Sequence, residues 1–242
     1  MLLAIDIGNT RSKAAVFEGS SLLEHFVFPK MALRENILDI IEKHKTIADI
    51  ALSSVSNESL DFEIPARINI HVISNAWPFP FLNLYETPLT LGIDRMVLAS
   101  GAALQFPNQN RLVIDAGTCI TYDFIDEKDH YHGGAISPGI QLRYQALHNY
   151  TAKLPLLSVE APANYVGKST AASIHSGVVN GVVHEIDGFI NQYQQDYSNF
   201  IIILTGGDAD FLAKRLKNTI FANSNFLLEG LNRTFQYKIN ND

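Results

Sequence analysis

Ile5-Asp6-Ile7-Gly8-Asn9-Thr10, near the start of the 242-residue chain, has a second, altered copy at Ile114-Asp115-Ala116-Gly117-Thr118. Each copy follows a short apolar run and leads into another, which is the pattern of a strand, a tight turn and a returning strand. Glycine lets the backbone approach a ligand, threonine and turn N–H groups can bind phosphate oxygens, and aspartate can hold a hydrated cation. Two such turns indicate a duplicated domain that grips a nucleotide's phosphates from both sides.

The composition limits the classes of partner. Hydrophobic residues form 47% of the chain and charged residues 18%, which is enough core for one large domain or two ordinary ones. A net charge of −7, with scattered Lys and Arg, argues against nucleic acid or an anionic membrane as the main partner. No apolar run reaches the roughly 20 residues that span a bilayer, and an acid at position 6 argues against a signal peptide. The single cysteine, Cys119, favours a cytoplasmic location, and we expect its side chain to be a small buried hydrophobe.

Apolar periodicity predicts a similar series of elements twice. Strands near residues 2–7, 13–18 and 22–28 would form a meander, followed by a helix at 33–44, strands at 47–53 and 68–73, and a helix at 94–104. After a boundary near 107–110, strands at 111–115, 119–125 and 132–136 repeat the meander. A helix starting near Pro138, a long helix at 169–193, a buried strand at 200–204 and a helix through Leu216 follow.

This series predicts an α/β protein of duplicated ribonuclease-H-like domains, as in sugar kinases and actin-like ATPases, with the active site in the cleft between them. The expected domains are residues 1–108 and 109–242. The alternative is that both Asp-x-Gly-x-Thr turns are simple hairpins. A third glycine-rich turn, after the buried strand, argues against that alternative, and the absence of a Gly-x-x-x-x-Gly-Lys-Ser/Thr loop excludes a P-loop kinase.

A series of motifs along nearly the whole chain resembles the type III pantothenate kinase family. In family order they occupy residues 6–13, 85–88, 91–95, 114–118, 133–139, 151–155, 166–170, 177–181 and 205–207. One such motif is a weak signal, whereas their common order is specific. The resemblance implies an enzyme that uses ATP to phosphorylate the primary hydroxyl of pantothenate, giving 4′-phosphopantothenate, the first step towards coenzyme A.

The first loop resembles the family's ATP phosphate loop. The resemblance implies that ATP is contacted by Asp6, Ile7, Gly8, Asn9, Thr10, Arg11, Ser12 and Lys13. Asp6 is expected to hold Mg²⁺ through water, and Lys13 to add a positive charge. Phosphoryl transfer needs mainly such positioning and charge neutralisation. Lys13 could equally be an ordinary surface lysine of the second strand.

The stretch Gly92-Ile93-Asp94-Arg95 resembles the family's acceptor motif. The resemblance implies that all four residues bind the substrate and that Asp94 is the catalytic base, which must lie within hydrogen-bond reach of the reacting hydroxyl. At a helix start Asp94 is also a good N-cap, and the two roles are compatible. Arg95 offers a planar fork for the pantothenate carboxylate. A salt bridge with a nearby acid is the alternative for Arg95.

Two further residues match family positions that contact pantothenate. Tyr85 combines an aromatic ring with a polar tip, which suits a polar ligand carrying a dimethyl carbon. Its alternative is a buried core tyrosine. Thr170 matches the other position, and its alternative is an ordinary residue at the start of the following helix.

The second half carries the remaining ATP contacts that the resemblance implies. Thr118 corresponds to the ATP-contacting threonine of the second phosphate loop, and Gly206 and Gly207 to the adenosine-side loop. Asp115 matches the site of a monovalent cation, K⁺ or NH₄⁺. A carboxylate beside phosphates would be repelled without such a cation.

The expected cofactors are therefore Mg²⁺ with ATP and a monovalent cation, and the family resemblance implies a homodimer with pantothenate near the subunit interface. The eight histidines show no metal-ligand spacing, and His130 and His132 are expected to be exposed in a hairpin. Two rivals remain: a kinase of this fold for another small acceptor such as a sugar, and a non-catalytic regulator that kept the fold. Intact acids at Asp6, Asp94 and Asp115 count against the regulator.

Overall fold

The computed structural model describes residues 1–8, 11–54, 60 and 62–241, so Asn9 and Thr10 of the first loop lie outside the described residues. The chain divides into two compact units. Unit 1 comprises Met1–Pro107, Asp129–His132 and Asn225–Asp242, and unit 2 comprises Asn108–Lys128 and Gly133–Ser224. The expected division at 108/109 differs from these units at residue 108, at residues 129–132 and at the carboxy-terminal segment 225–242.

Unit 1 is built on a five-stranded sheet of order β3-β2-β1-β4-β5. The strands are β1 (Leu2–Ile7), β2 (Arg11–Glu18), β3 (Ser21–Pro29), β4 (Asp49–Ser54) and β5 (Asn69–Val72). The first three form an antiparallel meander, and β4 and β5 join it in parallel. The other elements are η1 (Lys30–Ala32), α1 (Leu33–Lys43), β6 (Leu82–Asn83), η2 (Pro88–Thr90), α2 (Ile93–Gln105) and α7 (Phe226–Asn241).

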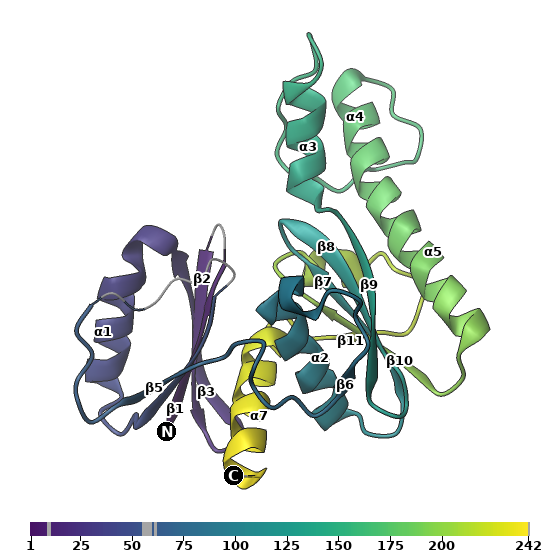
Figure 1. Cartoon of the computed structure of the whole chain (residues 1–242). Helices are drawn as coiled ribbons and strands as arrows, with labels where there is room; N and C mark the ends of the chain where they lie inside the picture. Colours follow the sequence, from purple (N-terminus) through teal and green to yellow (C-terminus); the bar gives the residue numbers. More distant parts are fainter. Residues whose placement is uncertain (9–10, 55–59, 61, 242) are drawn as a thin grey trace. The chain divides into compact units, whose positions relative to one another are not determined.

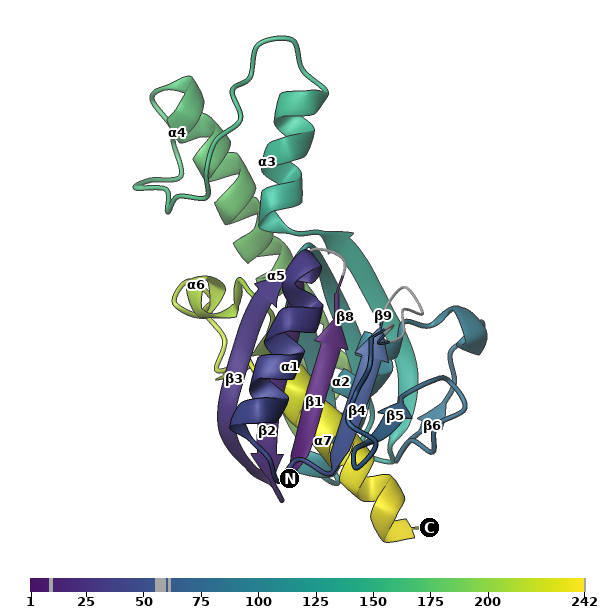
Figure 2. The ribbon, with the colours of Figure 1, turned by 90° about the vertical axis from the view of Figure 1, so that its left-hand side faces the viewer.

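Helices cover both faces of this sheet, with α1 in front and α7 behind in Figure 2. Alternate residues of β1 (Leu3, Ile5, Ile7) pack with Ile37 and Ile40 of α1, because side chains along a strand alternate between the faces. The opposite face, which carries Asp6, is therefore the α7 side of the sheet.

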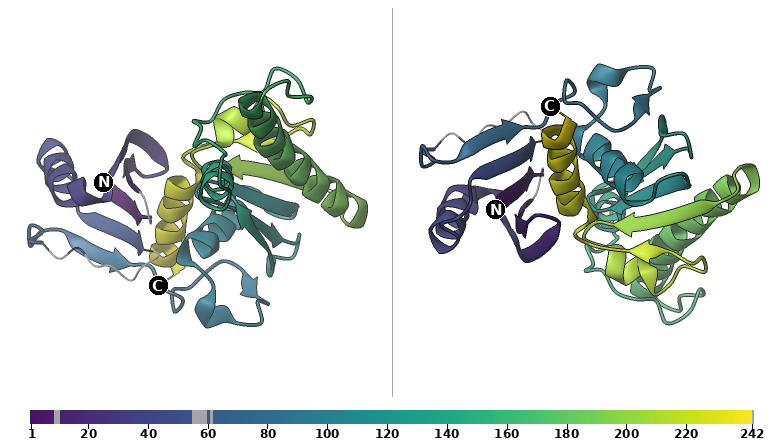
Figure 3. Two further views of the ribbon diagram at one scale, coloured as in Figure 1. Left: turned by 90° about the horizontal axis from the view of Figure 1, so that it is seen from above. Right: turned by 90° about the horizontal axis from the view of Figure 1, so that it is seen from below.

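Helix α7, which the sequence analysis did not predict, explains why the carboxy terminus belongs to unit 1. It packs along α2, as both views of Figure 3 show. The two helices approach closely where Gly230 meets Gly101, since a Cβ on Gly101 would crowd the Gly230 backbone and a Cβ on Gly230 would crowd the Val97 carbonyl oxygen. The Thr234 hydroxyl also donates to the Ser100 hydroxyl at 2.7 Å.

The sheet of unit 2 repeats the strand order of unit 1. It has the order β11-β10-β7-β8-β9-β6, with β7 (Asn110–Ala116), β8 (Cys119–Ile125), β9 (His130–Pro138), β10 (Phe200–Thr205) and β11 (Phe221–Ala222). Here β7 and β8 are antiparallel, whereas β10 joins β7, and β11 joins β10, in parallel. Apart from β6, which belongs to unit 1 and pairs there with His130 and Tyr131, the order of appearance in both sheets is third, second, first, fourth, fifth. This recurrence confirms the predicted duplicated ribonuclease-H-like fold (Figure 1).

The helices of unit 2 differ in detail from the prediction. They are α3 (Ile140–Asn149), α4 (Thr170–His175), the π-helical turn η3 (Ser176–Asn180), α5 (Gly181–Asp196) and α6 (Ala209–Ala213). The single helix expected at 169–193 is thus interrupted by η3. Pro138 ends β9, and Gly139 is the N-cap of α3. Cys119 is exposed, so its expected burial is wrong, because it opens β8 directly after the turn. None of the described helices is long and apolar enough to span a membrane.

Candidate active site

A buried carboxylate marks the first loop. The Asp6 side chain is buried inside unit 1, where the hydroxyl of Ser53, on the neighbouring strand β4, donates to its Oδ1 at 2.8 Å. Burial raises the pKa of Asp6 to about 6. The Ser53 hydrogen bond and the charge of Lys13 oppose this rise, whereas the charge of Asp94 adds to it. Asp6 therefore lies within electrostatic reach of both Asp94 and Lys13 in unit 1.

Strand geometry decides which side chains of the loop can share this site. Lys13 lies directly opposite Asp6 in the β1–β2 ladder, so both point to the same face of the sheet. Lys13 therefore lies on the Asp6 side of the sheet, and its positive charge lowers the pKa of Asp6. Ile7 and Ser12, also paired, are fully buried on the opposite, α1 face. The structure does not bring their side chains to the site.

The remaining described residues of the loop form its turn. The Gly8 N–H donates to the carbonyl of Arg11 at 3.2 Å, and a Cβ on Gly8 would crowd that oxygen. Arg11, at the start of β2, is exposed. The tight turn therefore requires glycine, and its backbone can approach a ligand closely.

The acceptor motif opens helix α2. Gly92, in extended conformation, is the N-cap, so the expected N-cap role of Asp94 is wrong by two residues. Asp94 instead lies in the first turn, where the helix dipole favours a negative charge, and its Oδ1 accepts the Arg95 N–H at 2.9 Å. A Cβ at position 92 would overlap Oδ1 of Asp94. Glycine at 92 therefore makes room for the carboxylate, and Ile93 anchors the turn in the core.

Arg95 and Tyr85 lie together beside this turn. The Arg95 guanidinium is buried, with its carbon 5.8 Å from the centroid of the Tyr85 ring, a distance at which cation and ring attract. Tyr85 is half-buried, its ring 6.2 Å from that of Tyr131, and its N–H donates to Asn83. The expected substrate residues Tyr85, Asp94 and Arg95 thus share unit 1 with Asp6.

In unit 2 the turn between β9 and α3 packs against the second phosphate loop. Gly139, between β9 and α3, donates its N–H to the carbonyl of Thr118 at 3.0 Å, and a Cβ there would overlap the Gly117 oxygen. Thr118 itself is exposed. These close backbone approaches fix the conformation of the loop that is expected to bind phosphate.

The loop after β10 packs on the same segment. Gly206 has φ +95, a conformation that favours glycine, and a Cβ there would overlap Oδ1 of Asp115 and the oxygen of Ala116. The Asp208 N–H donates to the Ala116 carbonyl at 2.9 Å, and Gly207 is exposed. The structure therefore brings Asp115, Gly206 and Gly207 together in unit 2.

Thr170 is the first residue of α4 and is exposed. Ser169 is the N-cap, and its hydroxyl accepts the Ala172 N–H at 3.2 Å. Thr170 could be a substrate contact or an ordinary residue at the helix start, because an exposed hydroxyl is compatible with both. Unit 2 offers no described contact between Thr170 and the second phosphate loop.

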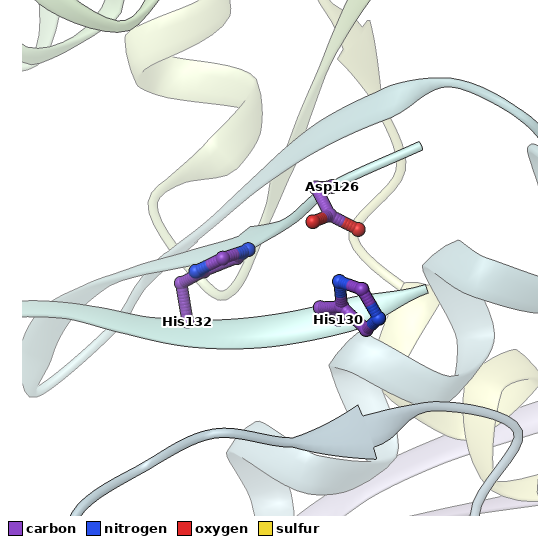
Figure 4. Close-up of side chains that lie close together, drawn as sticks. All are labelled: Asp126, His130 and His132. Atoms are coloured by element: carbon purple, nitrogen blue, oxygen red, sulfur yellow. The ribbon is translucent and has the colours of Figure 1, made fainter. Parts of the chain in front are cut away.

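A separate group of ligand-type side chains lies at the turn between β8 and β9 (Figure 4). One ligand atom each of Asp126, His130 and His132 lies within 4.8 Å of the others. The hairpin and the exposure of His132 match the expectation, whereas His130 is half-buried and the proximity of Asp126 was not foreseen. Exposed groups of this kind are common without an ion, and we assign this one no metal.

Sequence reasoning missed the residues that support the site. Ser53 is the clearest, since its only local signal is a pair of serines at the end of an apolar strand. It meets Asp6 through strand pairing across 47 positions. Glu185 of α5, which binds groups from three other elements, was likewise missed.

Comparison with known proteins gives a consistent family. A family model described as type III pantothenate kinase matches residues 2–192. The chain is 65% identical to the type III pantothenate kinase of Flavobacterium johnsoniae, with 100% of both chains covered. It is 54% identical to that of Flavobacterium psychrophilum, covering 98% of this chain and 100% of the relative.

Solved structures show the same fold at low identity. One is an activator of the 2-hydroxyisocaproyl-CoA dehydratase from Clostridium difficile with bound ADPNP, with a TM-score of 0.56, 11% identity, and 99% and 96% of the two chains covered. Another is a glucokinase from an Antarctic psychrotroph, with a TM-score of 0.53, 12% identity and 98% of each chain covered. These likenesses agree with the duplicated sheets.

Proposed function

This chain belongs to the type III pantothenate kinase family, and we propose that Asp94 is its catalytic base, with Asp6 and Lys13 at the phosphates of ATP. As a member of that family it is a kinase that phosphorylates pantothenate with ATP, in the first step of coenzyme A biosynthesis. The family assignment favours pantothenate over a sugar as acceptor, and an enzyme over a regulator. The observation that carries the site assignment is that the buried Asp6 stands opposite Lys13 in the β1–β2 ladder, while the charge of Asp94 raises the pKa of Asp6.

Asp94 is suited to the role of base by its place in the first turn of α2. A carboxylate there can accept the proton of the pantothenate hydroxyl as the hydroxyl oxygen attacks the γ-phosphorus of ATP. The Arg95 N–H, which donates to Oδ1 at 2.9 Å, fixes the orientation of the carboxylate. The buried guanidinium of Arg95 is proposed to bind the pantothenate carboxylate, with Tyr85 beside it.

Asp6 fits the magnesium ion that ATP brings, because hard cations take carboxylate oxygens and the Ser53 hydrogen bond occupies only part of the carboxylate. The ion would neutralise charge on the phosphates. Lys13 adds a second positive charge on the same face of the sheet.

Residues of unit 2 are proposed to complete ATP binding. Thr118 and the backbone of the second phosphate loop would bind phosphate oxygens, and Gly206 and Gly207 would lie against the adenosine. Asp115 is proposed to hold K⁺ or NH₄⁺. Two like charges a few ångströms apart repel by several kcal/mol at an effective dielectric of about 20, and a monovalent cation would relieve that repulsion.

We also propose a homodimer in the cytoplasm, where ATP is available, with Thr170 as a pantothenate contact near the subunit interface. The segment from α3 to α4 supports an interface because it exposes large apolar side chains: Leu142, Tyr150, Leu156, Tyr165 and Val166. Tyr150 and Tyr165 are 89% and 83% exposed.

The function is tested by following ADP release with pantothenate, against a panel of sugars, in K⁺ and in Na⁺ at constant ionic strength with excess Mg²⁺. We expect turnover with pantothenate only, and a lower rate or weaker ATP binding when Na⁺ replaces K⁺. Asp115→Asn should blunt the cation dependence. Turnover of a sugar instead would reject the acceptor, and full activity without K⁺ or NH₄⁺ would reject the cation site.

Arg95→Lys should raise the KM for pantothenate about tenfold or more while changing the KM for ATP little, since lysine keeps the charge but cannot form a two-point contact with a carboxylate. Steady-state kinetics with each substrate varied in turn measures this. Equal effects on both substrates would identify Arg95 as part of a structural salt bridge.

A further inference from the structure

One carboxylate in unit 2 ties together three elements around the second phosphate loop. Glu185, on α5, accepts the Tyr122 hydroxyl of β8 at 3.0 Å and the Ser137 hydroxyl of β9 at 2.5 Å on Oε1. Its Oε2 accepts the Arg143 guanidinium of α3 at 2.6 Å. Figure 1 locates these four elements. The carboxylate is therefore a junction of α3, α5, β8 and β9.

The junction is charged and partly shielded from solvent. Burial raises the pKa of Glu185, but the hydrogen bonds from Arg143, Ser137 and Tyr122 outweigh it, so the pKa lies below its usual value. Burial and the Glu185 charge raise the pKa of Tyr122, which stays a neutral donor. At neutral pH these are charge-assisted hydrogen bonds, roughly twice as strong as neutral ones.

Arg143 carries this restraint to the phosphate loop. Its Nε donates to the carbonyl of Pro138 at 2.8 Å while a second nitrogen of its guanidinium holds Glu185. Gly139, which follows Pro138, donates its N–H to the carbonyl of Thr118 at 3.0 Å, and a Cβ on Gly139 would overlap the oxygen of Gly117. A shift of Arg143 would therefore move the turn that supports the phosphate loop.

We propose that Glu185 is a positioning residue which, through Arg143, holds the β9–α3 turn against Gly117 and Thr118 and thereby sets the affinity for ATP. This inference rests on the proposed ATP role of the second phosphate loop. It assigns Glu185 no contact with substrate.

Direct ATP binding by calorimetry, without pantothenate, tests the proposal in two variants of the full chain. Glu185→Gln keeps the shape and an acceptor for Tyr122 and Ser137 but loses the charge that holds Arg143. Arg143→Lys keeps a cation near Glu185 but loses the rigid fork that reaches Pro138. Loss of one charge-assisted hydrogen bond predicts about a tenfold weaker Kd for ATP in each variant.

The matched control is Asp187→Asn on the same helix. Asp187 is buried and its Oδ1 accepts from Lys217 and Asn218, so it ties α5 to the segment after α6. The control should lower the melting temperature but leave the Kd for ATP within about twofold of wild type. The KM for pantothenate should change little in all three variants.

Two results would overturn the proposal: an unchanged Kd for ATP in Glu185→Gln or Arg143→Lys, or the same weakening in Asp187→Asn. Amide exchange of the peptide containing Gly117 and Thr118 adds a readout independent of activity, and we expect faster exchange in the two Glu185–Arg143 variants only. A wild-type protein that binds ATP but does not phosphorylate pantothenate would reject the proposed function while leaving this inference open to the same binding test.

Discussion

Asp94→Asn should fold, bind ATP and lose turnover by roughly 100-fold or more, because the amide cannot accept the proton of the attacking hydroxyl. The residue lies in the first turn of α2, where its Oδ1 accepts the Arg95 N–H. An asparagine oxygen can accept the same hydrogen bond, so the turn should keep its conformation. The measurement is kcat at saturating pantothenate and ATP, together with the melting temperature.

The control for Asp94→Asn is Glu35→Gln, which removes an exposed acid from the first turn of α1. Both substitutions lose the favourable interaction with a helix dipole, worth at most about 1 kcal/mol at such positions. Only Asp94→Asn should lose turnover. A rate within about threefold of wild type would show that Asp94 has a structural role in the helix start and is not the base.

Asp6→Asn should abolish activity and, without metal or ATP, make the protein more stable at neutral pH. The pKa of Asp6 is raised from 3.8 to about 6 by burial, opposed by the Ser53 hydrogen bond and Lys13 and reinforced by Asp94. Above pH 6 the carboxyl is ionised in the folded and unfolded states, and the difference of about 2 units corresponds to about 3 kcal/mol against folding.

This cost depends on pH in a defined direction. As pH falls from 6 towards 3.8, the folded protein takes up the proton first, so the cost of the Asp6 charge disappears. The advantage of Asp6→Asn should therefore be largest above pH 6 and vanish near pH 4. Melting temperatures of the metal-free proteins at pH 7.5 and pH 4 measure it. If wild type and Asp6→Asn had equal melting temperatures at pH 7.5, the buried charge could not be the source of the raised pKa.

If Asp6→Asn gains stability and loses activity, the Asp6 carboxylate serves function at a cost in stability. An acid retained in the interior of unit 1 weakens the free protein, and a cation bound there compensates the charge. We expect excess Mg²⁺ with ATP to stabilise wild type more than Asp6→Asn, since only wild type has the carboxylate that holds the ion.

The turns of the two phosphate loops could be predicted because they depend on residues that are adjacent in the sequence. Gly8 stands where the turn leaves no room for a Cβ, and Gly206 has a positive φ that favours glycine. Such positions demand glycine whatever the rest of the chain does. The repeated meander was predictable for the same reason, since alternating apolar residues and turn residues are local signals.

Helix α7 was not predicted, although Phe226, Leu231 and Phe235 are buried in it. Gly230 and Asn232 interrupt the apolar pattern and are unusual in a helix interior. In the structure both residues make contacts outside the helix: Gly230 faces Gly101, and Asn232 donates to the carbonyl of Gly19. Tertiary contacts override the local preference there.

The sequence by itself determined the strand–turn–strand motifs, their duplication and the family of the chain, because each depends on residues a few positions apart. Only the tertiary structure decided which loop residues can act. Strand pairing places Lys13 on the same face of the sheet as Asp6 and turns Ser12 into the core, and it brings Ser53 to Asp6 from 47 positions away. The raised pKa of Asp6 follows from burial, which depends on the packing of the whole unit and on no single stretch of sequence.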